Sequence, residues 1–189
     1  MVPLSDDELR AVTIGELEEI NAPIELSEYD PAWPRLFAVE EERIRAALGD
    51  AVVVLEHVGS TSVPELAAKP ILDALLVVED SAAEARYVPA LQAIGYVLRI
   101  REPDWHEHRL LRKHDPAANL HVHSRGCPEI DRILSFRDHL RSHGEDRQVY
   151  EDAKRALARQ TWKYMQHYAD AKSEVINQII ERAIPADQT

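Results

Sequence analysis

Two short apolar runs constrain the fold more than any other feature of the chain. They are AVVVLEHV at 51–58 and ILDALLVV at 71–78, and a loop with a Gly-Ser-Thr-Ser cluster, two prolines and a lysine separates them. Both runs are short and rich in β-branched or aliphatic residues, which is typical of buried strands. Three segments with alternating polarity, 96–102, 108–114 and 119–125, predict further strands.

Most of the remaining chain has the spacing of helices. We expect helices at 4–20, 34–48, 81–95, 128–143, 145–160 and 161–184. Strands followed by a helical C-terminal tail predict a mixed β-sheet flanked by helices, an α/β or α+β fold.

Bulk properties limit the function classes. A chain of 189 residues fits one domain. The net charge of −12, from 22 basic and 34 acidic residues, disfavours nucleic acid as a partner. The single cysteine fits a reducing compartment. Because no signal peptide and no run of about 18 apolar residues is present, we expect a cytoplasmic protein without a membrane partner. The oligomeric state cannot be predicted.

Asp73 is the acid in a core strand. Alternation places it on one face with Ile71, Leu75 and Val77. An ionised carboxylate among apolar neighbours is costly unless it is paired, hydrogen-bonded or bound to a cation. Two interpretations follow: Asp73 caps the strand or pairs with Lys69 or an arginine, or it binds a hard cation at the mouth of the strand.

The loop before Asp73 has the composition of a phosphate-binding turn. Ser62 can cap a short helix that begins near Pro64, and exposed backbone N–H groups suit phosphate. A tight turn without a ligand explains the same residues. The candidates for phosphate or substrate contact in and after this loop are Gly59, Ser60, Thr61, Ser62 and Lys69.

Arg137 and Arg141 are two further candidates for binding an anion. They lie one turn apart on the helix FRDHLRSH and can clamp phosphate or carboxylate. Surface salt bridges with Asp131 and Asp138 are the alternative.

Two His-x-His pairs are candidates for a metal or substrate site. His121 and His123 share one face of the strand NLHVHSR, and His106 and His108 have the same spacing in WHEHRLL. The pattern is short, and His106 and His108 are the weaker pair.

Several blocks of the sequence resemble the GrpB family, also described as the UPF0157 group. They are HVGSTSVPELAAKPILD, IELSEYDPAWPRLF, NLHVH, FRDHLR and HYADAKSEVINQII, in the family's order. The resemblance indicates one GrpB-like domain at 24–189, preceded by a helical extension at 1–23.

The resemblance implies a nucleotidyltransferase fold, in which a Gly-Ser turn holds nucleotide phosphates and acids on the next strand bind divalent metal. Gly59, Ser60 and Asp73 match those positions. Leu75 stands where a second acid is expected, and Glu65 where the family pattern usually has glycine. Because metal-assisted transfer needs several oxygen ligands, the departure at Leu75 weakens the case for catalysis.

Three functional hypotheses remain from the sequence. The first is transfer of a nucleotidyl group from a nucleotide to a small acceptor, with Asp73 catalytic. Its metal would be held by Asp73, His121 and His123; it would be Mg²⁺ or Mn²⁺, with Zn²⁺ a weaker choice. The second is a non-catalytic nucleotide- or ligand-binding module on a degenerate transferase fold. The third is a histidine-rich metal site with hydrolytic chemistry.

Overall fold

A five-stranded mixed sheet forms the centre of the molecule, which confirms the predicted fold class. The computed structural model describes residues 4–183. The strand order is β1-β2-β5-β4-β3; β2 and β5 are parallel, and the other neighbours are antiparallel. The strands are β1 Val54–Val58, β2 Leu72–Val78, β3 Val97–Glu102, β4 His108–His114 and β5 Ala117–Ser124.

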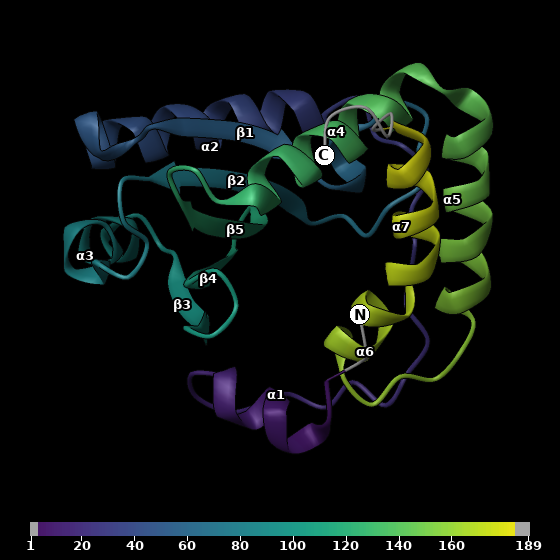
Figure 1. Ribbon diagram of the computed structural model, residues 1–189, viewed down its shortest axis with the longest axis horizontal. Helices are drawn as coiled ribbons and strands as arrows, with labels where there is room; N and C mark the ends of the chain where they lie inside the picture. The colour runs from purple at the N-terminus through teal and green to yellow at the C-terminus, as the bar shows by residue number, and fades with distance from the viewer. Residues whose placement is uncertain (1–3, 184–189) are drawn as a thin grey trace.

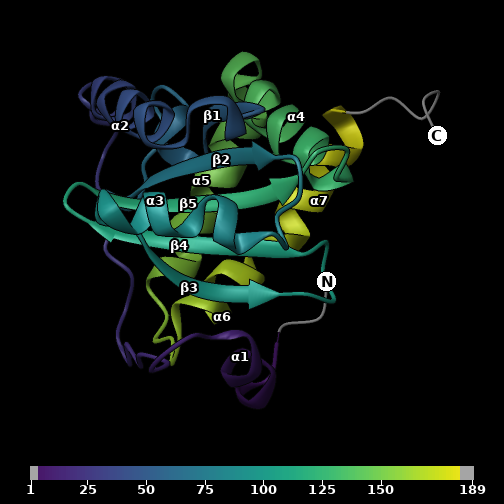
Figure 2. The same ribbon diagram turned by 90° about the vertical axis from the view of Figure 1, so that its left-hand side faces the viewer.

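Helices cover both faces of this sheet (Figures 1 and 2). On one face α2 and α3 enclose the largest apolar core, whereas α4, α5, α6 and α7 lie on the other side, and α1 lies beyond the edge strand β3. The α-helices of the described chain are α1 Asp6–Val12, α2 Trp33–Leu48, α3 Val88–Ala93, α4 Pro128–Ser142, α5 Gly144–Ala158, α6 Met165–Ala171 and α7 Ser173–Ala183. No helix in the described range 4–183 has the length and apolar character needed to cross a membrane.

Alternate residues of β2 pack against different helices, as the period of two in its sequence predicts. Leu72, Ala74 and Leu76 pack into the core under α2 and α3. Leu75 and Val77 point to the opposite face, where they pack against α4. Since Asp73 shares that opposite face, the acid lies on the side of α4 to α7.

The first predicted helix is too long. Ser5 caps α1 and forms a capping box with Glu8, as acidic residues after a serine favour. The helix nevertheless ends at Val12, because Thr13 forms a bridge with Ile100 of β3 and Gly15 has a φ of +84°. Tertiary pairing with the sheet edge overrides the ragged apolar stripe that predicted a helix to residue 20.

Two other predicted helices are broken. The segment 81–95 forms a single 3₁₀ turn at Glu84–Arg86 and then the short helix α3, which begins with Pro89 in its first turn rather than being kinked by it. The segment 161–184 forms α6 and α7 with a break at Lys172, and residue 184 lies outside the described residues. The predicted domain limits at 1 and 189 also lie outside them.

Candidate anion-binding cavity

The turn after β1 lies directly against Asp73. Gly59 has a φ of +64°, and a Cβ built on it would lie 2.5 Å from Asp73 Oδ2. Glycine is therefore required both by the backbone conformation and by the close approach of the carboxylate. Asn119, the partner of Asp73 on β5, donates a hydrogen bond of 2.9 Å to Asp73 Oδ1. The Asp73 carboxylate thus packs against Gly59 and accepts a hydrogen bond from Asn119, and it forms no ion pair with Lys69 or an arginine among the described residues.

The rest of the turn is a single 3₁₀ turn over Ser60–Ser62, and no α-helix begins at Ser62. Ser62 Oγ donates back to the Gly59 carbonyl at 2.7 Å, whereas Thr61 Oγ1 lies 3.0 Å from His57 Nε2. The expectation that Ser62 caps a helix is therefore wrong, because its hydroxyl is used to close the turn. Glu65 has a φ of +65°, so the backbone keeps a conformation that suits glycine although glutamate occupies the position.

A cavity of about 330 Å³ lies between this part of the sheet and the helices α4 to α7. Asp73 is the one carboxylate among the residues that line it. Its basic lining residues are Lys69, Arg112, Arg132, Arg137, Lys154 and Lys172.

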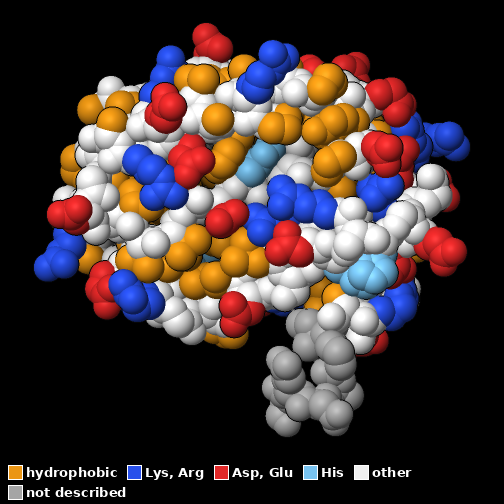
Figure 3. Space-filling model, turned by 90° about the horizontal axis from the view of Figure 1, so that it is seen from above, with side chains coloured by type: hydrophobic (Ala, Val, Ile, Leu, Met, Phe, Trp, Pro, Cys, Tyr) orange, Lys and Arg blue, Asp and Glu red, His pale blue; other side chains and the backbone are white. Residues whose placement is uncertain are grey.

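Four of these six cations have no carboxylate partner in the described chain. Arg132 pairs with Glu129 and Arg137 with Glu56, whereas the ion pairs among residues 4–183 include none of the others. Elsewhere on the molecule, basic side chains lie beside acidic ones, as Figure 3 shows for one face. The four remaining cations are Lys69, Arg112, Lys154 and Lys172, which we call the unpaired cations.

Burial makes the charges of these lysines expensive. Desolvation lowers the pKa of Lys154 to about 7 and that of Lys69 to about 8, and it also lowers the pKa of Lys172. Lys154 donates to Ser60 Oγ at 3.0 Å and to the carbonyl of Ala67. These neutral acceptors hold the ammonium in place without balancing its charge.

Tyr168 of α6 lies between two of the lysines. Lys172 Nζ is 4.9 Å and Lys69 Nζ 5.7 Å from the centre of its ring, which are cation–π distances. Its hydroxyl and Arg112 Nε are the two buried side-chain polar atoms without a hydrogen-bond partner in the described chain. Because buried polar groups normally have partners, both atoms mark the lining of this cavity as incomplete.

The two predicted arginines differ. Arg137 lines the cavity, but it pairs with Glu56 at 2.8 Å and with Asp138, and it donates to the carbonyl of His57 at 3.0 Å. Arg141 donates to the carbonyl of Ser62 at 3.0 Å and lies outside the lining. Arg141 therefore stabilises the Gly59–Ser62 turn and Arg137 the end of β1, and the acidic partners of Arg137 leave it little free charge for a ligand.

The histidines separate into different environments. His121 lines the cavity and His123 does not; His123 stacks on His108 at 4.8 Å and lies 3.5 Å from Cys127 Sγ. His108 is buried at the start of β4, whereas His106 precedes the strand in an exposed turn with a φ of +53°. The expectation that His106 and His108 share one strand face is therefore wrong.

The described residues around Asp73 offer few ligands for a divalent metal ion. No group of three or more His, Cys, Asp or Glu residues within 4–183 is placed to hold one. Leu75, at the position of the expected second acid, is fully buried in the apolar cluster under α4. The cations around Asp73 oppose a further positive charge.

Five important cavity residues are absent from the sequence-based candidates. Lys154 gives the clearest missed signal: it lies four residues from both Tyr150 and Ala158, so it falls on the buried stripe of α5. A lysine on such a stripe is either paired or functional. The five are Arg112, Asn119, Lys154, Tyr168 and Lys172.

The fold and the cavity define a mixed α+β protein whose sheet forms the floor of a cation-rich pocket. Residues 23–182 match the family model described as GrpB protein. The chain belongs to the GrpB family.

Individual relatives agree with this assignment. The UPF0157 protein BH1888 of Halalkalibacterium halodurans is 57% identical, over 96% of this chain and 93% of that protein. The crystal structure of conserved protein GrpB from Enterococcus faecalis has a TM-score of 0.72 and 29% identity, covering 84% of this chain and 98% of that chain. A protein named dephospho-CoA kinase from Mycolicibacterium paratuberculosis is 30% identical, over 71% of this chain but 40% of its own length.

Proposed function

We propose that this protein binds a phosphorylated small molecule, with a nucleotide as the first candidate, in the cavity between the sheet and α4 to α7. The observation that carries the proposal is the set of four unpaired cations around a single carboxylate. Buried charges are costly without a counter-charge, and a phosphate supplies two negative charges and several acceptor oxygens.

The chemistry of the lining favours phosphate over a simple carboxylate. Arg112 and the lysines approach the cavity from the sheet, the loop before β2, α5 and the break between α6 and α7. A tetrahedral anion can accept hydrogen bonds from several directions at once, whereas a carboxylate offers two oxygens in one plane. The similarity to a protein named dephospho-CoA kinase is in keeping with a phosphorylated ligand.

Nucleotidyl transfer to a small acceptor, with Mg²⁺ or Mn²⁺, is the second candidate. The close approach of Gly59 to Asp73 favours it, because it places the Gly-Ser turn beside a carboxylate. The lone acid makes binding the better-supported function.

Isothermal titration with pyrophosphate and with ATP, both without divalent metal, tests the proposal. We expect binding by the unmodified protein and a loss of about tenfold in affinity in Lys172→Met, since one charge-assisted contact is removed. Lys163→Met is the matched control, because Lys163 pairs with Asp6 outside the cavity. Equal affinities in the unmodified protein and Lys172→Met, or no binding at millimolar ligand, would contradict the proposal.

Manganese distinguishes the two candidates. If the protein transfers nucleotidyl groups, Mn²⁺ should strengthen ATP binding, and Asp73→Asn should remove that effect. If it only binds phosphates, Mn²⁺ should leave the affinity of the protein unchanged once the metal–ATP equilibrium is subtracted.

A further inference from the structure

A chain of hydrogen bonds leads from the edge of the sheet into the cavity. Glu102 at the end of β3 contacts His108 at the start of β4, with 2.6 Å between Oε2 and Nδ1. His108 Nε2 in turn lies 3.1 Å from Nδ1 of His121 on β5. His121 lines the cavity, so the last imidazole of the chain meets whatever occupies it.

Glu102 fixes which atoms donate and which accept along this series of hydrogen bonds. Burial lowers the pKa of both His108 and His121 to about 4, so each ring is neutral at pH 8 and carries one N–H. Burial raises the pKa of the Glu102 carboxyl, and in its ionised form at pH 8 this group can only accept, so the hydrogen of His108 is on Nδ1. His108 Nε2 then accepts from Nδ1–H of His121, and His121 Nε2 keeps a free lone pair.

We propose that Glu102 and His108 are positioning residues that hold His121 as a hydrogen-bond acceptor, so that the cavity selects a phosphorylated ligand with hydroxyl groups. A sugar phosphate, or the ribose of a nucleotide, has this chemistry. The inference rests on the proposed function and names the part of the ligand that lies beside the phosphate.

We infer hydroxyl groups on the ligand because two hydrogen-bond acceptors lie side by side on the floor of the cavity. Asp73 on β2 and His121 on the neighbouring strand β5 point to the same face, and both line the cavity. A phosphate oxygen placed against the Asp73 carboxylate or His121 Nε2 would set lone pair against lone pair, whereas a hydroxyl group can donate to either. The three unpaired lysines approach from the loop before β2, from α5 and from the break between α6 and α7, and Arg112 lies on β4 beside this floor, so together they can hold the phosphate.

Nitrogen-15 NMR of the histidine rings tests the positioning directly and needs no ligand. At pH 8 we expect His121 to carry its hydrogen on Nδ1, with Nε2 at the shift of an unprotonated nitrogen. Glu102→Gln should produce a mixture of the two tautomers, because an amide can donate or accept. Glu107→Gln is the control, since Glu107 lies in the turn that joins β3 to β4 but pairs with Arg109 and not with His108. Hydrogen on Nε2 of His121 in the unmodified protein would overturn the inference.

Titration with ribose 5-phosphate and with inorganic phosphate tests the ligand class. We expect ribose 5-phosphate to bind about tenfold more tightly, and this ratio to fall toward one in His121→Leu and to decrease in Glu102→Gln. His106→Leu, at an exposed histidine, should keep the ratio. Equal affinities for the two compounds in the unmodified protein overturn the ligand class. Absence of binding by both overturns the proposed function instead, and the NMR result then decides the positioning on its own.

Discussion

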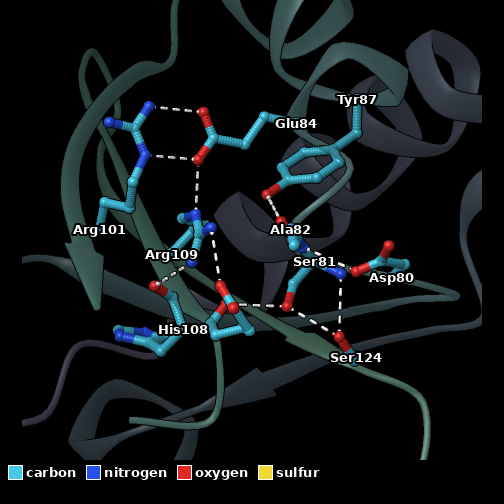
Figure 4. Close-up of polar contacts among 10 residues, drawn as sticks. Asp80, Ser81, Ala82, Glu84, Tyr87, Arg101, His108, Arg109 and Ser124 are labelled. Atoms are coloured by element: carbon cyan, nitrogen blue, oxygen red, sulfur yellow. Dashed lines mark hydrogen bonds and ion pairs between the residues drawn. The ribbon is translucent and has the colours of Figure 1, made fainter. Parts of the chain in front are cut away.

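Two regions of this protein bury charged groups, and they do so in opposite ways. Around Ser81, at the far end of the sheet from the cavity, the polar groups have partners within the chain (Figure 4). Glu84 forms ion pairs with Arg101 and with Arg109, each with an N···O distance of 2.6 Å. Tyr87 Oη donates a hydrogen bond of 2.6 Å to the carbonyl of Ser81.

In the cavity, by contrast, the four unpaired cations lie near one acid, and two buried polar atoms have no partner among residues 4–183. The comparison teaches that burial of charge has two uses here. The cluster around Ser81 stabilises the junction of β2, β4 and the segment before α3. The cavity retains an electrostatic deficit that an anion can fill.

Removal of Glu84 should have the largest effect on stability. Glu84→Ala leaves the buried Arg109 without its main partner, and we expect a loss of about 3 kcal/mol in the free energy of unfolding. Glu79→Ala is the control, because its pair with Arg125 is exposed and should contribute less than about 0.5 kcal/mol. Urea denaturation measures both; equal losses would show that the cluster around Ser81 is no better coupled than the surface.

Gly59→Ala should have the next largest effect. The added methyl group would meet Asp73 Oδ2 at 2.5 Å in a left-handed backbone, and we expect a cost of about 2–3 kcal/mol. Gly49→Ala separates the two causes, since its φ is +53° and nothing lies within 4 Å of the new Cβ. The free energy of unfolding of that control should fall by about 1 kcal/mol. A similar loss in both variants would mean that the contact with Asp73 is not rigid.

Lys172→Met should change stability by less than about 1 kcal/mol, in contrast to Glu84→Ala. Replacing a buried charge without an acidic partner by an apolar side chain of similar length removes a desolvation cost. Thermal unfolding without ligand measures the change. A loss as large as that of Glu84→Ala would indicate that Lys172 has a structural partner after all.

The pH dependence of stability should separate the two regions by the pH range in which stability rises, because both contributions increase with pH. The pKa of Glu84 is lowered to about 2 by Arg101 and Arg109, so its contribution is present above about pH 4.5 and is lost as the pH falls toward 2. The pKa of Lys154 is lowered to about 7, so the unfolded chain binds more protons above that pH, and the ligand-free protein gains stability as the pH rises from 7 to 10. Lys154→Met should remove part of this rise in denaturation curves, and an unchanged slope would contradict it.

The sequence predicts the sheet well because strands depend on local alternation. The predicted strand 108–114 matches β4, and the buried and exposed faces of β2 follow from its period of two. The lengths of α1 and α3 are harder to predict. The bridge between Thr13 and β3 limits α1, and Pro89 in its first turn sets the start of α3, so helix propensity does not decide either length.

The cavity could be predicted only in part. Asp73 and the Gly-Ser turn stand out because a core acid and a small polar loop are locally unusual. Lys154 lies on the amphipathic helix α5, where a lysine normally marks the solvent side, and Lys172 lies at the break between α6 and α7, which the sequence pattern does not predict. Their convergence on Asp73 depends on how α5, α6 and α7 pack, and no local pattern encodes that packing.

The attachment of α1 to α6 and the segment before it joins parts of the chain that are synthesised far apart in time. Asp6 pairs with Lys163, and the backbone N–H of Leu4 donates to Asp170 Oδ2, so residues near the two ends of the chain hold each other. Contacts across such separations close the largest loops in the molecule, and they form after local ones. On the ribosome the sheet can assemble while α6 and α7 are still in the exit tunnel, so the side of the cavity formed by α6 and α7 is the last to acquire its native structure.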